Sequence, residues 1–241
     1  MITPLVVANW KMSIEEPQIR EFVASWRAST DTAVDCVIAP PLAYLGLLSQ
    51  VPGIQLAGQD CSSEGSGAFT GECSAASLLA LGCQFGIVGH SERRQRHGET
   101  DDVVAAKAEQ LEAVALTPIV CVGESSQERE AGETFGVIEQ QVRAAVQGLS
   151  KAPVVAYEPI WAIGTGVAAE ASDADAVQQA IAKVLKSIFD NEGDGRVLYG
   201  GSVKPENTAE FMSKQGIDGL LVGGASLTAE SFMDICRNAG G

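Results

Sequence analysis

The stretch VVAYEPIWAIGTG, residues 154–166, contains the pattern from which the fold of the chain is predicted. Its first four residues form a continuous apolar run, which is typical of a strand buried on both faces of a parallel sheet. A carboxylate, Glu158, follows the strand directly. A loop and then a helical stretch, residues 173–190, come after it. The segment is therefore predicted to form one strand–loop–helix unit.

The same unit recurs along the whole chain. The expected strands are residues 5–8, 36–39, 54–57, 85–88, 118–122, 154–157, 196–199 and 219–222. The expected helices are residues 17–27, 42–49, 75–81, 102–115, 135–149, 173–190, 205–214 and 228–238. Eight units in a chain of 241 residues predict an α/β fold with a closed (β/α)8 barrel, the TIM-barrel architecture. Periodicity alone also allows an open doubly wound sheet, although no GxGxxG motif follows the first strand.

No Pro-rich or Ser-rich linker interrupts the units, so residues 1–241 are expected to form one domain. Asp101–Asp102 and Ser172–Asp173 are predicted to supply capping side chains and negative charge at helix starts, and Pro205 with Glu206 to open the seventh helix.

Composition limits the classes of function. The net charge of −15 disfavours binding to nucleic acid or to an anionic membrane. The chain has no long apolar run, and its first residues, MITPLVVANW, resemble a strand rather than an export signal, so a cytoplasmic location is expected. The six cysteines are scattered, which favours reduced thiols. The two histidines do not have a metal-ligand spacing, so no metal site is expected.

Polar residues and glycines gather where the predicted strands end. In a closed barrel these positions share one face, where active sites form. They are Asn9, Trp10 and Lys11 after the first strand; Gly89, His90, Ser91, Glu92, Arg93 and Arg94 after the fourth; Glu158 after the sixth; Gly200, Gly201 and Ser202 after the seventh; and Gly223, Gly224 and Ala225 after the eighth. Each has an ordinary alternative: a solvated lysine, a histidine satisfied within the core, ion-paired surface charges, or glycines that only make turns. The combination of a carboxylate, an imidazole, an ammonium and two glycine turns on one face instead predicts an active site.

The glycine turns after the last two strands predict a site for a phosphorylated substrate. Glycine lets backbone N–H groups approach an anion closely, and loops at these positions often bind phosphate. Lys11 would add the positive charge.

The segment after Glu158 has the composition of a lid over the site. It has proline at one end, glycines at the other and an apolar body between them. Its residues are Pro159, Ile160, Trp161, Ala162, Ile163, Gly164, Thr165 and Gly166. The alternative is a surface loop that happens to contain a tryptophan.

Eight motifs give the chain a resemblance to one family. They are ANWKM, APPLAYL, GAFTGE, VGHSERR, TPIVCVGE, YEPIWAIGTG, YGGSV and DGLLVGGASL. Together they cover the whole length, in order, and the chain resembles the triosephosphate isomerase family. The resemblance implies interconversion of dihydroxyacetone phosphate and D-glyceraldehyde 3-phosphate through an enediolate, in glycolysis and gluconeogenesis, without a cofactor.

The resemblance also implies roles for individual residues. Glu158 matches the family's base and His90 its neutral electrophile, which are established roles in this family. Asn9 and Lys11 match residues that bind substrate and stabilise the enediolate. The positions that match the phosphate-binding backbone are Gly164, Ser202, Gly223 and Gly224.

The family is dimeric, and its third loop reaches into the partner's active site. The corresponding loop here, residues 60–72, has no helical pattern and contains Phe69 and Thr70, so a homodimer through this loop is expected. The chain departs from the usual family pattern at Ser13, Asp60 and Cys61.

Two other functions are weighed against this one. One is another phosphosugar enzyme on the same barrel, such as a different isomerase or an aldolase. An aldolase would need a Schiff-base lysine within the barrel or a metal, and the only lysine at a predicted strand end is Lys11. A binding or scaffold protein that kept only the fold would not need Glu158, His90, Lys11 and the lid together.

Overall fold

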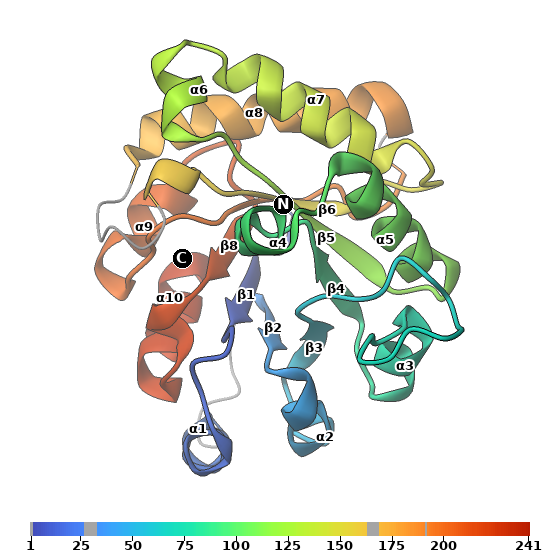
Figure 1. The fold of residues 1–241 in the computed structure, drawn as a ribbon. Coiled ribbons are helices and arrows are strands. Elements are labelled where there is room, and N and C mark those ends of the chain that lie inside the picture. The colour runs from blue at the N-terminus through green and yellow to red at the C-terminus, as the bar shows by residue number, and fades with distance from the viewer. Residues whose placement is uncertain (1, 27–32, 163–168, 191) are drawn as a thin grey trace.

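The computed structural model describes residues 2–26, 33–162, 169–190 and 192–241. Parallel strands form a closed barrel in sequence order, and β1 pairs with both β2 and β8 (Figure 1). The strands are β1 Leu5–Asn9, β2 Asp35–Ala39, β3 Gln55–Gly58, β4 Phe85–Val88, β5 Thr117–Val122, β6 Val154–Tyr157, β7 Val197–Tyr199 and β8 Gly219–Val222. The predicted (β/α)8 barrel is thereby confirmed, and the open sheet is excluded by the pairing of β1 with β8.

Helices surround the barrel in the described parts of the chain (Figure 1). The α-helices are α1 Glu16–Trp26, α2 Leu45–Leu48, α3 Ala75–Ala80, α4 Ser91–His97, α5 Asp101–Ala113, α6 Ser126–Glu130, α7 Thr134–Val146, α8 Ala171–Phe189, α9 Pro205–Met212 and α10 Ala229–Gly240. Short 3-10 turns are η1 Leu42–Tyr44, η2 Ile160–Ala162 and η3 Gly224–Ser226. The sequence pattern did not predict α4 and α6, which are short and polar.

The N-terminal caps of the helices differ in part from those predicted. The side chain of Thr100 caps α5 by accepting from the Val103 N–H, so Asp101 and Asp102 lie in the first turn, where their charge faces the positive helix end. The capping prediction for Ser172 is wrong, because α8 already begins at Ala171 after Glu170. α9 begins at Pro205 as predicted.

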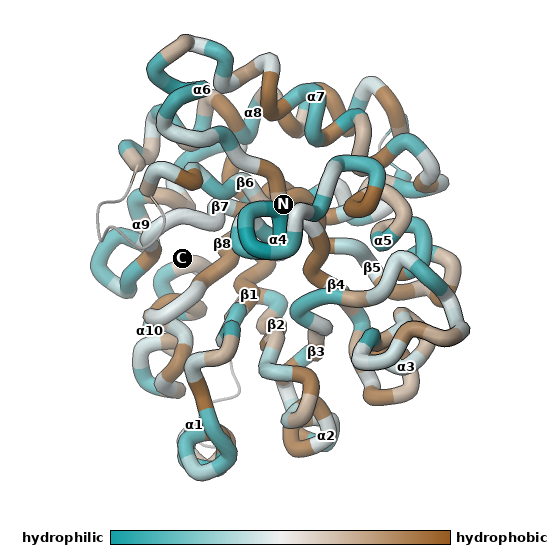
Figure 2. Tube along the Cα trace, in the orientation of Figure 1, coloured by the Kyte–Doolittle hydropathy of each residue, from teal (hydrophilic) through white to brown (hydrophobic). Residues whose placement is uncertain are grey.

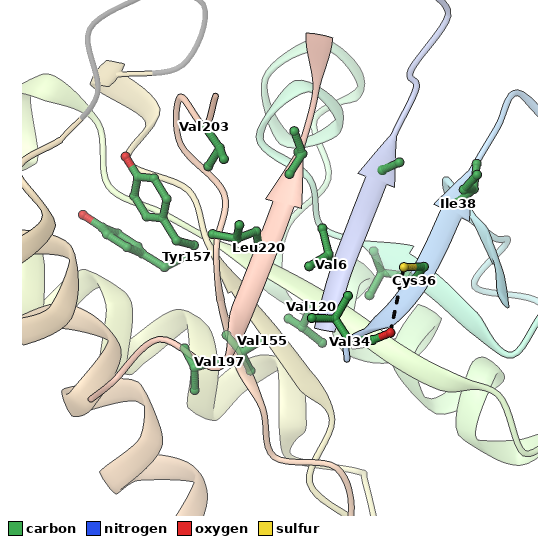
Figure 3. Packing of buried hydrophobic residues seen from close by; sticks show 14 of the residues in the cluster. Val6, Val34, Cys36, Ile38, Val120, Val155, Tyr157, Val197, Val203 and Leu220 are labelled. Carbon is green, nitrogen blue, oxygen red and sulfur yellow. Dashed lines mark hydrogen bonds between the residues drawn. The ribbon is translucent and has the colours of Figure 1, made fainter. Parts of the chain in front are cut away.

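The core has two layers because alternate residues of each strand point in opposite directions. Leu5 and Val7 of β1 belong to the cluster inside the barrel, together with Ile119 of β5 and Ala156 of β6. Val6 of β1 belongs to the larger cluster between strands and helices. Figure 3 shows this second layer, in which Val6, Val120, Val155, Tyr157 and Leu220 are packed together.

Hydropathy follows this arrangement. Figure 2 shows hydrophobic residues along the strands and hydrophilic residues on α4, beside the carboxyl ends of the strands. No helix in the described ranges is both long and apolar enough to cross a membrane. The six cysteines are thiols, as predicted, and Sγ of Cys36 lies 3.5 Å from Sγ of Cys236.

Candidate active site

The carboxyl ends of the strands surround a cavity of about 580 Å³. Its lining includes most of the predicted site residues, namely Asn9, Lys11, His90, Glu158, Ser202, Gly223 and Gly224. It also includes Ser91, Glu92, Gln95, Arg96, Ile160, Gly200, Gly201, Val203, Lys204, Leu221 and Ala225. Gly164 lies outside the described residues. The topology therefore brings together side chains that are far apart in the sequence.

Glu158 follows β6 and its side chain is almost fully buried, with 2% exposure. One carboxylate oxygen, Oε1, lies 2.9 Å from Nε2 of His90. The other, Oε2, accepts a hydrogen bond of 2.9 Å from the backbone N–H of Ser91. Both oxygens of this buried carboxylate thus have a defined polar partner.

His90 lies at the turn between β4 and α4, where it caps the helix. Its Nδ1 accepts a hydrogen bond of 3.2 Å from the backbone N–H of Glu92. Because Nδ1 acts as an acceptor, the neutral imidazole is assigned its proton on Nε2, the nitrogen that faces Glu158. The ring therefore presents an uncharged N–H donor to the site.

Lys11 adopts a left-handed backbone conformation, with φ of 49°. The backbone N–H of Lys11 donates a hydrogen bond of 3.1 Å to Asn9 Oδ1, and the carbonyl oxygen of Lys11 accepts one of 2.8 Å from Gln59 Nε2. The ammonium Nζ lies 2.9 Å from Oε1 of Glu92. Partial burial acts to raise the pKa of Glu92, but the hydrogen bond and charge of Lys11 outweigh it, and the pKa is lowered. Lys11 is thus directed into the cavity by a strained backbone and an ionised partner.

The turns after β7 and β8 form another side of the cavity. A Cβ on Gly201 would lie 2.2 Å from the hydroxyl oxygen of Tyr199, so only glycine fits there. Ser202 Oγ donates to the carbonyl oxygen of Ala162 at 3.3 Å, and Asn207 donates to the carbonyl oxygen of Ser202 at 3.2 Å. These contacts place a hydroxyl and a glycine backbone beside the cavity, as the sequence predicted.

The described part of the predicted lid is Pro159 to Ala162; Ile163, Gly164, Thr165 and Gly166 lie outside the described residues. Ile160 lines the cavity, whereas Ala162 is buried away from solvent. Trp161 is anchored by its indole N–H, which donates to Glu124 Oε1 at 2.9 Å, and by the Arg129 guanidinium, 4.3 Å from the ring centre. The near end of the segment therefore has defined contacts outside the cavity.

The loop of residues 60–72 contains no helix or strand. Asp60 lies 2.8 Å from Nζ of Lys107 and 2.8 Å from Nε of Arg93. Phe69 is 45% exposed. A second cavity of about 480 Å³ lies beside the first and shares Asn9, Lys11, His90, Glu92 and Arg96 with it. The loop thus starts from a charged anchor and presents an aromatic side chain to solvent.

Sequence reasoning missed several contributors. Glu92 was placed at a strand end, but the pattern did not indicate that it would hold Lys11. The contacts of Ser91 and Gln59 involve backbone groups, which leave no signal in residue type. The alternative of ordinary ion pairs fits Arg93 and Arg94, which bind Glu99 and Asp101. The described residues hold no group of three or more His, Cys, Asp or Glu side chains suited to a metal ion.

Comparison with known proteins gives a consistent result. A family model described as triosephosphate isomerase matches residues 4–239. The triosephosphate isomerase of Symbiobacterium thermophilum is 44% identical over 99% of this chain and 98% of its own length. The enzyme of Streptococcus mutans is 44% identical over 95% and 96%, respectively. The crystal structure of triosephosphate isomerase from Bartonella henselae superposes with a TM-score of 0.89, at 33% identity, over 98% of this chain and 99% of that one. The chain belongs to the triosephosphate isomerase family.

Proposed function

We propose a residue-level mechanism for the reaction of this family, the interconversion of dihydroxyacetone phosphate and D-glyceraldehyde 3-phosphate. The observation that carries it is the contact between the buried carboxylate of Glu158 and Nε2 of His90 inside the cavity. Glu158 removes a proton from the carbon beside the carbonyl group and returns it to the neighbouring carbon. One carboxylate on one face of the substrate serves both transfers.

His90 donates hydrogen bonds to the oxygen atoms of the substrate. Its Nε2–H donates to the carbonyl oxygen and supports the negative charge that develops on the enediolate. Because the Glu92 N–H occupies Nδ1, the ring keeps the tautomer that this role requires. The neutral ring can exchange a proton with each substrate oxygen in turn.

Lys11 supplies the positive charge. Its ammonium stabilises the enediolate and attracts the phosphorylated substrate against the net charge of −15. Asn9 is 6% exposed and supports Lys11 through the hydrogen bond to its backbone. Glu92 holds the ammonium in place before the substrate arrives.

The phosphate group of the substrate binds at the turns after β7 and β8, to Ser202 and to the backbone N–H groups of Gly223 and Gly224. The backbone N–H of Gly164 adds a further hydrogen bond to the phosphate when the lid closes. The segment from Pro159 to Gly166 acts as the lid and protects the enediolate from loss of phosphate. Every proton that moves belongs to the substrate or to these side chains, so the mechanism includes no cofactor.

A homodimer completes the assembly in this proposal. The loop of residues 60–72 from one subunit enters the second cavity of the other, where Met12 is 94% exposed and available for contact with Phe69. Burial of such apolar side chains favours association. Sedimentation velocity of the wild type and of Phe69→Glu tests it: a dimer that dissociates in the variant is expected, and a monomeric wild type would contradict it.

The reduced thiols support activity in the cytoplasm.

The central experiment is an isomerase assay with either triose phosphate, coupled to detection of the other. The wild type should isomerise both substrates, and Glu158→Gln should be inactive while its fold, measured by circular dichroism, is kept. Glu130→Gln, an exposed carboxylate on α6, is the matched control and should be fully active. A wild type without isomerase activity would contradict the function, and an active Glu158→Gln would contradict the role of Glu158.

A further inference from the structure

The backbone of Gly123, just beyond the end of β5, is bound by a single side chain from α7. The N–H of Gly123 donates to Gln141 Oε1 at 2.9 Å, and Gln141 Nε2 donates back to the carbonyl oxygen of Gly123 at 3.1 Å. The side-chain amide of Gln141 therefore closes a ring with the N–H and the carbonyl group of one residue, Gly123. Gln141 is half-buried, and its helix covers this part of the barrel (Figure 1).

Gly123 lies directly against the peptide group of Glu158. A Cβ built on Gly123 would lie 1.9 Å from the carbonyl oxygen of Glu158 and 2.9 Å from its carbonyl carbon. These distances are far below van der Waals contact, so only glycine allows the two backbones to approach in this way. A shift of Gly123 is therefore transmitted directly to the backbone of Glu158.

Hydrogen bonds on either side of Gly123 extend the sheet past the ends of β5 and β6. The N–H of Glu158 donates to the carbonyl oxygen of Val122 at 2.7 Å, and the N–H of Ile160 donates to that of Glu124 at 3.3 Å. On the other side of β5, pairing with β4 reaches only Val120. Gln141 thus takes the place that a neighbouring strand would occupy beside Gly123.

We propose that Gln141 is a positioning residue for Glu158. By holding both polar groups of Gly123, it keeps the extended end of β5 in register with the backbone of Glu158. This register sets the place from which the carboxylate reaches His90 Nε2. The inference rests on the proposed role of Glu158 as the base. A displacement of about 1 Å at such a group is sufficient for a large loss of rate.

The test is Gln141→Leu, which removes both hydrogen bonds at similar side-chain volume. The matched control is Gln140→Leu, an exposed glutamine at the preceding position of the same helix. We expect kcat of Gln141→Leu to fall about 10-fold or more. KM and inhibition by inorganic phosphate should stay within about twofold, because the phosphate groups belong to the turns after β7 and β8. The control should match the wild type.

A merely structural role for Gln141 predicts a different result. The melting temperature would fall, while kcat measured well below it would remain at the wild-type value; that outcome would overturn the inference. A fully active Glu158→Gln would remove the proposed role of Glu158, on which this inference rests, and a wild type without isomerase activity would remove the proposed function itself. Loss of activity in Glu158→Gln but not in Gln141→Leu would overturn only the role of Gln141.

A second variant tests the paired hydrogen bonds. In Gln141→Glu, a protonated carboxylic acid offers one donor and one acceptor, as the amide does, whereas the carboxylate offers no donor to the carbonyl oxygen of Gly123. The ratio of its kcat to that of the wild type should therefore rise as the pH is lowered from about 8 to about 6, since burial and the facing carbonyl favour the protonated acid. A low ratio that does not change with pH would contradict the role of the paired bonds.

Discussion

His90 and Glu158 follow strands that are not neighbours, β4 and β6, yet Nε2 of one lies 2.9 Å from Oε1 of the other. The intervening strand, β5, contributes Cys121 beneath them, and burial, followed by the charge of Glu158, raises the pKa of this thiol well above its ordinary value. The thiol therefore stays neutral beside the carboxylate. In the mechanism proposed above, the substrate binds between these two groups, so their contact opens when the substrate is bound.

The length of the side chain that carries the catalytic base, Glu158, is the first quantity to test. Glu158→Asp keeps the charge but withdraws the carboxylate by one methylene group. We expect kcat to fall on the order of 10²-fold because the carboxylate no longer reaches the carbon. Steady-state kinetics with both substrates measures it, and binding of phosphoglycolate serves as the control for an intact site. A kcat near that of the wild type would show that Glu158 is not the base.

The charge of Lys11 can be separated from its shape by Lys11→Met. We expect kcat/KM to fall by about 10²-fold or more, because the enediolate and the phosphate both lose a cation. Thermal stability should stay close to the wild type, because the Lys11–Glu92 pair is partly exposed. Lys183→Met, an exposed site on α8, is the control. If Lys11→Met unfolded the protein but left its specific activity intact, the structural role of Lys11 would be favoured.

The fluorescence of Trp161 is expected to report closure of the lid. Phosphoglycolate should shift its emission, because closure changes its contacts with Glu124 and Arg129. The other two tryptophans, Trp10 and Trp26, are buried in the core, so the comparison is best made by removing the reporter with Trp161→Phe rather than by replacing them. The same spectral change in Trp161→Phe would show that the signal comes from elsewhere.

Deletion of residues 163–166 tests the lid directly. The variant should bind phosphoglycolate more weakly and release inorganic phosphate from the substrate, because the enediolate would be exposed to water. Phosphate release is measured by a colorimetric assay alongside isomerisation. Unchanged affinity and no phosphate release would mean that the segment is a passive surface loop.

Lys107 is the strongest candidate for a purely structural charge. It is 4% exposed and its Nζ lies 2.8 Å from Asp60 and 2.6 Å from Glu99. Lys107→Met leaves two carboxylates without this cation and should lower the free energy of unfolding by about 3–5 kcal/mol. Urea unfolding measures it, with Lys183→Met as the control. A change as small as that of the control would contradict the prediction.

The loss in Lys107→Met should depend on pH. In the wild type, burial acts to raise the pKa of Glu99, but the hydrogen bonds to Lys107 and Arg93 outweigh it and the pKa is lowered; burial raises the pKa of Asp60 despite Lys107. The lowered pKa of Glu99 gives stability that is present above its unfolded-state pKa and lost as the pH falls through the folded-state value. Without Lys107 both pKa values should rise. The destabilisation should therefore be largest near neutral pH and decrease as the pH is lowered.

The strands were predictable because each is a continuous apolar run. The run at residues 54–57 lies within one residue of β3, and the run at 196–199 within one residue of β7. The helix α4 was not predicted because SERRQRH has no apolar stripe; the cap at His90 and ion pairs of its arginines support it instead. The site followed from residue types at strand ends. The pairing of Gln141 with Gly123 did not, because a glutamine in a helix gives no sign of which distant backbone it binds.

Closure of the barrel by β1 and β8 has a consequence for synthesis on the ribosome. One edge of β1, Leu5–Asn9, pairs with β8, Gly219–Val222, which follows it in the sequence only after all the other strands. At about 5–20 residues per second, the nascent chain carries that open edge for roughly 10–40 s before β8 exists. An unpaired strand edge is a template for pairing with other chains. Chaperone capture of the nascent protein should therefore persist until β8 has left the exit tunnel, and release should follow.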